Sequence, residues 1–192
     1  ISRTDAVGIA NGLAWTSVGG EMLPIEVSII PNGSGKVEIT GSLGDVMKES
    51  AHLALTYARV HAETYHIAPD KFKNTDIHIH APEGAVPKDG PSAGVTLTTA
   101  LISALSEIPV RHDLAMTGEI TLHGNVLPIG GLKEKSMAAF REGISTVLIP
   151  EANKPDLYEV DEEVKKAVKF IPVSDLSQVL KHAPVSYTHL TL

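Results

Sequence analysis

The stretch 87–105, "PKDGPSAGVTLTTALISAL", lies at the middle of this 192-residue chain and sets its organisation. A long apolar run begins just after Ser92. Pro91 suits the first turn of a helix, because its missing N–H would have no partner there. The stretch therefore predicts a helix from Pro91 to about Leu105, preceded by a loop over 83–90.

The residues before this helix predict strands on either side of one long helix. Residues 7–42 are rich in β-branched side chains and favour two or three antiparallel strands. Turns are expected at Gly19-Gly20 and at "PNGSG", which is 31–35. Asp45 is expected to open a helix that ends near His66, and the alternating pattern of 76–82 predicts a strand.

The residues after it alternate between strand and helix patterns. The expected elements are two strands around a turn at 123–125, a helix over 132–143 closed by Gly143, strands at 145–150 and 169–173, a short helix at 162–168, and a final helix at 174–182 capped by Ser174. The whole pattern predicts an α+β or mixed α/β fold with an antiparallel N-terminal part. We expect one domain over 1–182, or two tightly joined lobes, and a disordered or non-native tail at 183–192.

Composition excludes several classes of function. The net charge of −7 argues against a nucleic-acid binder with a broad basic surface. Cysteine is absent, so the chain has no disulfide, no thiolate nucleophile and no cysteine-ligated metal. No run approaches the roughly 20 apolar residues of a membrane span. We expect a cytoplasmic protein without membrane or nucleic-acid partners, and a chain that starts at Ile1 suggests an excised or processed fragment.

Two motifs are weak candidates for ligand sites. "PNGSGK" has Ile30 where a phosphate-binding loop needs glycine, and Val37 where it needs serine or threonine, so it is interpreted as a hairpin turn. His78 and His80 lie on one face of a strand and offer two metal ligands. Their spacing reveals no third ligand, so two histidines on the polar face of a half-buried strand is the simpler interpretation.

Ser92 is the stronger candidate. In the first turn of a helix it lies beside backbone N–H groups, including those of Ser92 and Ala93, that suit a developing oxyanion. "GPSAG" also matches the nucleophile-elbow pattern, but a loop rather than a strand precedes it. Alternatively, serine is simply common at helix starts. A nucleophilic serine needs a base, either one of nine histidines or a lysine of "GGLKEK" (130–135), where burial and the helix N-terminus lower a lysine pKa.

Five blocks of the sequence closely resemble the proteolytic domain of Lon, the ATP-dependent protease La. They are "GLAWTSVGGEMLPIEV", "GSLGDVMKES", "HAPEGAVPKDGPSAG", "MTGEITLHGNVLPIGGLKEK" and "VLIPEANKPDL", in this order from about Val7 to His182. The resemblance implies a serine endopeptidase with a Ser–Lys dyad. It places the nucleophile at Ser92, the lysine at Lys135, a supporting threonine at Thr117 and a supporting acidic residue at Asp89.

The resemblance also implies partners and a wider context. Unfolded or damaged proteins are the expected substrates, and a hexameric ring is the expected assembly. This fragment is expected to need no cofactor, since ATP and magnesium belong to an ATPase module that it lacks. The stretch 83–90 is expected to pair with substrate as an added strand. The last ten residues depart from the family.

Helix geometry also favours Lys135 over Lys133 as the base. Two positions apart, their side chains point about 200° from one another. Lys135 shares its face with Ala138 and Ala139, whereas Lys133 shares its face with Met137 and Arg141, which suggests a solvent-facing side. Two other functions remain open: a catalytically silent interaction domain of the same fold, and a metal-dependent hydrolase built on His78 and His80.

Overall fold

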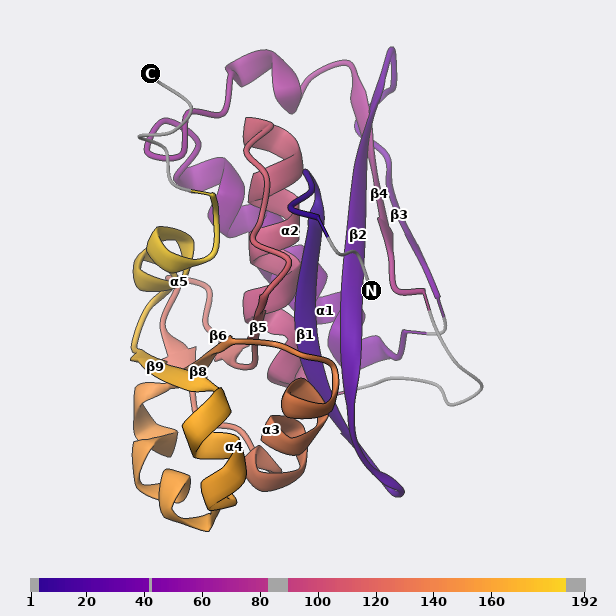
Figure 1. Ribbon diagram of the computed structural model, residues 1–192. Coiled ribbons are helices and arrows are strands. Elements are labelled where there is room, and N and C mark those ends of the chain that lie inside the picture. Colours follow the sequence, from indigo (N-terminus) through magenta and orange to yellow (C-terminus); the bar gives the residue numbers. More distant parts are fainter. Residues whose placement is uncertain (1–3, 42, 83–89, 186–192) are drawn as a thin grey trace.

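The computed structural model describes residues 4–41, 43–82 and 90–185, and its described strands form one mixed sheet and one small ribbon (Figure 1). The sheet has seven strands in the order β3-β4-β2-β1-β5-β8-β9. Their bounds are β1 Ile9–Thr16, β2 Gly19–Pro31, β3 Val37–Thr40, β4 Thr75–His80, β5 Leu114–Met116, β8 Thr146–Pro150 and β9 Lys169–Val173. The ribbon pairs β6 (Glu119–Ile120) with β7 (Val126–Leu127).

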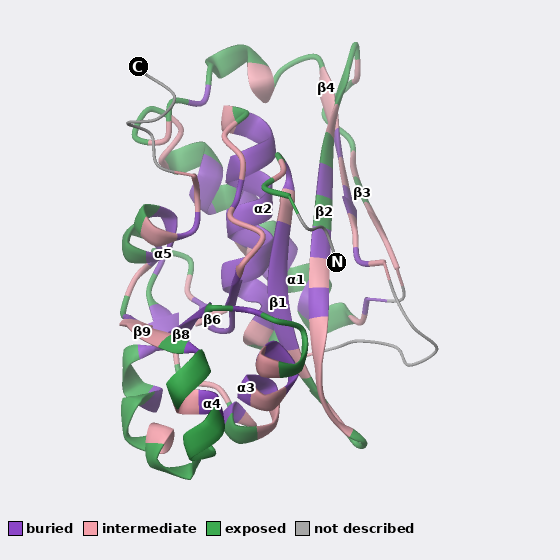
Figure 2. Cartoon of the chain, in the orientation of Figure 1, coloured by how far each residue is buried: buried purple, intermediate pink, exposed green. Residues whose placement is uncertain are grey.

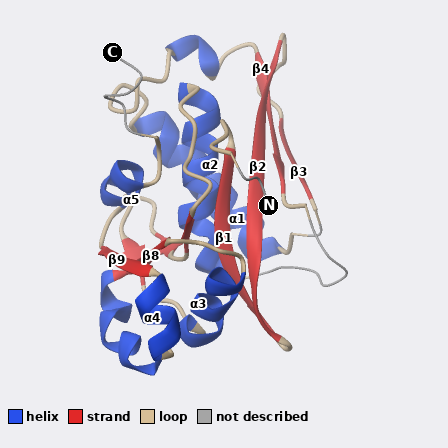
Figure 3. Cartoon of the chain, viewed as in Figure 1, coloured by secondary structure: helices blue, strands red, loops and turns tan. Residues whose placement is uncertain are grey.

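The helices surround this sheet. The α-helices are α1 Asp45–Val60, α2 Gly94–Ser106, α3 Leu132–Arg141, α4 Glu162–Ala167 and α5 Leu176–His182. Three 3-10 helices are η1 Pro69–Lys71, η2 Pro91–Ala93 and η3 Glu151–Glu159. Figure 3 shows α1 and α2 beside the long strands, and α3 and α4 near the end of the sheet that carries β8 and β9.

The direction of the strands changes across the sheet. β1 pairs antiparallel with β2, and β2 pairs antiparallel with β4. On its other side β1 pairs parallel with β5, and β5-β8-β9 continue in parallel. The expected mixed α/β fold with an antiparallel N-terminal part is therefore confirmed, and β1 joins the two kinds of pairing.

The helix predicted from the central stretch forms the middle of the core. Every residue of α2 from Gly94 to Leu105 is buried, and α2 packs on α1, β1 and β2 (Figure 2). A helix that is apolar all round is stable only when it is buried all round. A second apolar cluster lies between α3, α4 and the strands β1, β5 and β8, with members such as Leu13, Ala139 and Val147.

The hairpin expected at "PNGSG" is wrong. β4 lies between β2 and β3, and β3 pairs with β4 in parallel. The loop 31–36 crosses to that position and folds around Asp76, whose carboxylate accepts hydrogen bonds from the N–H groups of Ser34 and Lys36, both at 2.9 Å. These two hydrogen bonds lower the pKa of Asp76, and the bond from Lys36 has the larger effect.

Two helix boundaries also differ from expectation. α1 ends at Val60 rather than near His66, and 61–66 continue as turns. In this segment the rings of Tyr57 and His61 stack at 4.1 Å, and the hydroxyls of Tyr57 and Tyr65 share a hydrogen bond. Asp175, not Ser174, caps α5, because the Asp175 side chain accepts from the N–H of Gln178.

The stretch expected to lie outside the core begins with three docked residues. Ala183 is buried, and its carbonyl oxygen accepts from the N–H of Arg111 at 2.9 Å. The N–H of Val185 donates to the carbonyl oxygen of Pro109 at 2.8 Å. Residues 183–185 therefore pack on the rest of the chain, whereas 186–192 lie outside the described residues, so the expected tail stays a prediction.

Candidate active site

Ser92 and Lys135 line one cavity of about 500 Å³, although they come from different helices. Ser92 is the middle residue of η2, directly before α2, and Lys135 lies in the first half of α3. The other walls come from the end of β1 with its turn and from the segment before α3; they are residues 14–17, Gly90, Pro91, Ala93 and 128–130, with Leu23 and Met47.

Gly118 holds the start of the Ser92 helix from both sides. Its N–H donates to the carbonyl oxygen of Ser92 at 2.9 Å, and its carbonyl oxygen accepts from the N–H of Val95 at 3.1 Å. A side chain at position 118 would lie 2.8 Å from a methyl group of Val126 and 2.9 Å from one of Val95. A side chain at this position would therefore force these two valines to move.

This clamp decides which amides remain for an oxyanion. The N–H of Val95 is used by Gly118, and the N–H of Gly94 donates to the carbonyl oxygen of Pro91. The positive end of the helix therefore leaves the amides of Ser92 and Ala93 as the candidates nearest the serine hydroxyl. Their role as an oxyanion hole stays a prediction.

Lys135 is buried in a way that suits a neutral amine. Its side chain is 2% exposed, and Nζ donates a hydrogen bond to Oγ1 of Thr117 at 3.1 Å. Burial lowers the pKa of Lys135 from the ordinary lysine value of 10.5 to about 8, because the charged form loses its hydration. Lys133 is exposed, as its helix face predicts.

Two neighbours fix the start of α3. The ring of Trp15 lies against Gly131, the residue before the helix, at a distance that leaves no room for a side chain there. Thr117, itself 1% exposed, is held by its N–H, which donates to the carbonyl oxygen of Leu148 at 3.2 Å. The Lys135 amine and the Thr117 hydroxyl are thus held together, because Trp15 packs on the start of α3 and Leu148 holds the backbone after β5.

The remaining sequence candidates are either not described or lie elsewhere. Asp89, and 83–89 generally, lie outside the described residues, so the proposed role of Asp89 and substrate pairing along 83–90 stay predictions. His78 and His80 instead share the hydroxyl of Thr40, at 2.9 and 2.7 Å. Within 4–41, 43–82 and 90–185, no three or more His, Asp or Glu residues gather as a metal site would require.

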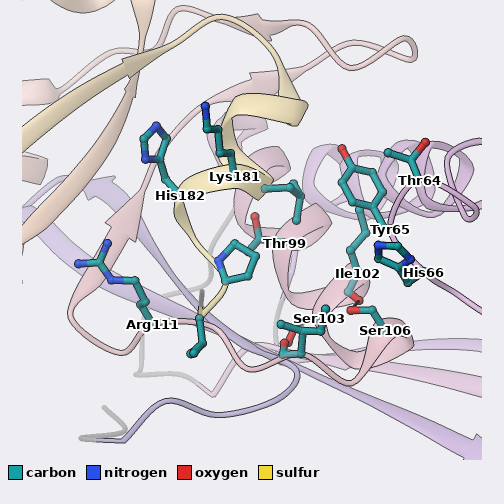
Figure 4. A pocket seen from close by; sticks show the side chains of 14 residues that line it. Thr64, Tyr65, His66, Thr99, Ile102, Ser103, Ser106, Arg111, Lys181 and His182 are labelled. Atoms are coloured by element: carbon teal, nitrogen blue, oxygen red, sulfur yellow. Dashed lines mark hydrogen bonds between the residues drawn. The ribbon is translucent and has the colours of Figure 1, made fainter. Parts of the chain in front are cut away.

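A larger cavity of about 700 Å³ lies at the other end of α2 (Figure 4). Three of its polar side chains bond to the chain itself. The hydroxyls of Ser103 and Ser106 donate to backbone carbonyl oxygens, and Arg111 is paired with Asp113 at 3.1 Å. None of its lining residues pairs a nucleophile with a buried base, so the Ser92 cavity is the better candidate.

Three residues that shape the site were missed from the sequence: Trp15, Gly118 and Asn153. Each lies inside one of the quoted blocks, but each acts through a contact with a residue far along the chain. Trp15, the chain's single tryptophan, is 59% exposed at the cavity, an unusual place for so large an apolar side chain. For Gly118 and Asn153 the sequence carries no comparable signal.

The chain is similar to known proteins over almost its whole length. The family model described as "Lon protease (S16) C-terminal proteolytic domain" matches residues 1–186. This chain belongs to the Lon proteolytic-domain family. It is 58% identical over 181 residues to Lon protease 1 of Myxococcus xanthus, covering 94% of this chain and 22% of that protein. It is 59% identical over 182 residues to Lon protease of Elusimicrobium minutum, covering 95% and 22%.

A third relative, Lon protease of Bacillus thuringiensis, is 57% identical over 183 residues, which are 95% of this chain and 23% of the relative. The chain thus spans less than a quarter of the length of these Lon proteases. In the described part of this Lon domain, no helix combines the length and apolar character needed to cross a membrane.

Proposed function

We propose that this Lon domain is a serine endopeptidase that hydrolyses peptide bonds with Ser92 as nucleophile and Lys135 as general base. One observation carries the proposal: a buried amine with a lowered pKa, bonded to Thr117, lines the same cavity as a helix-opening serine. A nucleophile within reach of an activated base is the requirement for covalent catalysis by serine.

The shift in pKa has a large effect on the population of the active form. With a pKa of about 8, about one Lys135 side chain in ten is neutral at pH 7, against about one in three thousand at 10.5. This lowering of the Lys135 pKa corresponds to about 3 kcal/mol, because burial destabilises the ammonium form.

The proposed reaction moves one proton back and forth. Neutral Lys135 takes the proton of the Ser92 hydroxyl as Oγ attacks the peptide carbonyl carbon. The amides of Ser92 and Ala93 donate to the oxyanion that develops. Lys135 then protonates the leaving amine, the C–N bond breaks, and an acyl ester remains on Ser92. Water, deprotonated by Lys135, hydrolyses the ester and restores the serine.

Thr117 is proposed to orient the amine. Its hydroxyl oxygen accepts one N–H of Lys135, which directs the rest of the amine toward the cavity. Asp89 is proposed to support the nucleophile from the residue stretch before it. Trp15 and Ile129, which line the cavity, give it an apolar wall for substrate side chains.

The wider context follows the family. We propose unfolded or damaged polypeptides as substrates, a cytoplasmic location and a hexameric ring as the assembly. No nucleotide site is proposed for this domain, since the 31–36 loop is closed around the Asp76 carboxylate, which would repel a phosphate. ATP and magnesium are proposed to act on another part of the protein.

Labelling and substitution test the proposal together. A fluorophosphonate or peptide boronate is expected to modify Ser92, as mapped by mass spectrometry, and Ser92→Ala is expected to abolish both labelling and peptide cleavage. Lys135→Ala is expected to be equally inactive, because members of a dyad act as a unit. Lys133→Ala is the matched control and should keep most activity.

Three results would reject the assignment: a label on another residue, an inactive Lys133→Ala variant, or near-normal turnover in Lys135→Ala. A folded wild-type domain that neither binds the probe nor cleaves peptides would favour the silent interaction domain instead. Circular dichroism of each variant separates loss of the site from loss of the fold.

A further inference from the structure

Asn153 makes two hydrogen bonds to the backbone of a single residue in the cavity wall. It lies in η3, is 3% exposed, and its Oδ1 accepts from the N–H of Ile129 at 2.9 Å. Its Nδ2 donates to the carbonyl oxygen of the same Ile129, also at 2.9 Å. The second N–H of this amide donates to Oδ2 of Asp156 at 2.8 Å.

The carboxamide of Asn153 bonds to Ile129 as the backbone of a neighbouring strand would. A residue in an antiparallel ladder exchanges both its N–H and its C=O with one partner residue, and Asn153 offers the same donor and acceptor from a side chain. Asp156 fixes which end of the amide carries the NH₂ group, because a carboxylate accepts only from that end. The geometry therefore uses every feature that distinguishes asparagine from aspartate.

The clamped residue, Ile129, is part of the cavity wall and precedes Lys135 in the sequence. Pro128, Ile129 and Gly130 all line the Ser92 cavity. The chain then passes Gly131, which has a left-handed φ of 74°, and enters α3. The carbonyl oxygen of Gly131 accepts from the N–H of Lys135 at 2.9 Å. A shift at Ile129 is thus passed on to the turn of helix that carries the amine.

We propose that Asn153 is a positioning residue for the active site: it fixes the 128–131 wall and, through it, the burial of Lys135. This inference rests on the proposed function for its kinetic consequence. Its structural consequence, the environment of the Lys135 amine, stands without any activity. The simpler alternative is that Asn153 serves only to stabilise η3 through Asp156.

An exchange of the two side chains separates these readings. In the double variant Asn153→Asp with Asp156→Asn, the new amide at 156 can donate to the new carboxylate at 153, so the contact within η3 is restored. The carboxylate at 153 has no donor for the carbonyl oxygen of Ile129 and repels it, so the clamp is lost. Asp156→Asn alone is the matched control, since Asn153 keeps both bonds to Ile129.

Two measurements are made on the wild type and these variants. The first is kcat and KM for a fluorogenic peptide over pH. The second is the titration of the Lys135 amine by NMR, assigned by its loss in Lys135→Met. The control is expected to match the wild type in both. The exchange variant is expected to lose at least tenfold in kcat, and its Lys135 pKa is expected to rise toward 10.5 as water reaches the amine.

An exchange variant with wild-type kcat and wild-type Lys135 titration would overturn the inference and leave Asn153 a residue of η3 alone. A control variant as impaired as the exchange would do the same. If the exchange variant shows no cooperative melt, Asn153→Ala replaces it, because alanine removes the clamp without burying a carboxylate. An unchanged Lys135 titration in folded Asn153→Ala then overturns the inference.

The two proposals fail in different ways. A wild-type domain without peptidase activity or labelling at Ser92 contradicts the proposed function, yet the NMR titration still compares Asn153 variants. Conversely, an active domain whose Lys135 is insensitive to Asn153 contradicts only the positioning role.

Discussion

Lys135 and Thr117 are eighteen positions apart in the sequence, and a 3.1 Å hydrogen bond joins Nζ of the first to Oγ1 of the second. Both residues are buried. The hydroxyl is neutral, so it orients the amine without stabilising its positive charge as a carboxylate would. The pair therefore combines a fixed direction with a low pKa, the two properties that a general base needs.

Replacing Thr117 tests the orientation. Thr117→Val keeps the shape and removes the acceptor, and we expect kcat to fall by tenfold or more with a small change in KM. Thr117→Ser keeps the hydroxyl and should retain most of the rate. Steady-state kinetics on one peptide give both constants, and a valine variant with normal kcat would show that the amine needs no such partner.

The rate should depend on pH through Lys135. Because the neutral amine is the proposed base, kcat/KM is expected to rise with pH through an ionisation near 8 and to level off above it. A profile that rises only near 10.5 would mean an exposed amine, and one controlled near 6.5 would point to a histidine base instead.

Stability should show the same ionisation with a definite sign. The pKa of Lys135 is lowered on folding, so between about 8 and 10.5 the unfolded chain holds the proton more tightly, and the free energy of unfolding rises with pH. Below 8 the folded state carries the full cost of the buried charge, about 3 kcal/mol. Lys135→Met should therefore be more stable than the wild type at pH 7, with the gain shrinking toward pH 10.5 in denaturant titrations.

Gly118→Ala should disturb the start of the Ser92 helix. The added methyl group meets Val126 and Val95 closer than 3 Å, so the neighbours must move. We expect a drop in stability of about 1–3 kcal/mol, typical of overpacking, with a lower kcat. Adding Val126→Ala makes room and should restore part of the rate. Unchanged kcat in Gly118→Ala would show that the clamp does not position Ser92.

Two truncations test whether residues 183–185 contribute to stability. Removing 186–192 is expected to change the melting temperature very little. Removing 183–192 also deletes the buried Ala183 and the backbone bonds to Pro109 and Arg111, so we expect a loss of about 2 kcal/mol. Equal melting temperatures for both truncations would contradict the docking of 183–185.

Local sequence patterns predicted most of these elements. They failed where a residue far along the chain determines the local structure. The apolar run of α2 and the two lysine faces of α3 could be read from spacing alone, because burial follows helix periodicity. The path of residues 31–36 could not be predicted from spacing, since Asp76 on β4 binds this loop. Gly118 and Asn153 were missed for the same reason: their partners, Ser92 and Ile129, lie 26 (118 − 92) and 24 positions away.

Because β5 lies between β1 and β8 in the sheet, the site can form only after β8 has been translated. β1 leaves the ribosome first, and β8 begins only at Thr146. Until then Thr117 lacks the Leu148 carbonyl that anchors its backbone, and Ile129 lacks Asn153. The proposed nucleophile is thus translated before the segments that hold the proposed base in place. The proposed site is therefore expected to stay inert on a nascent chain until β8 and η3 have emerged, so that the growing chain and its neighbours on the same messenger are not cut.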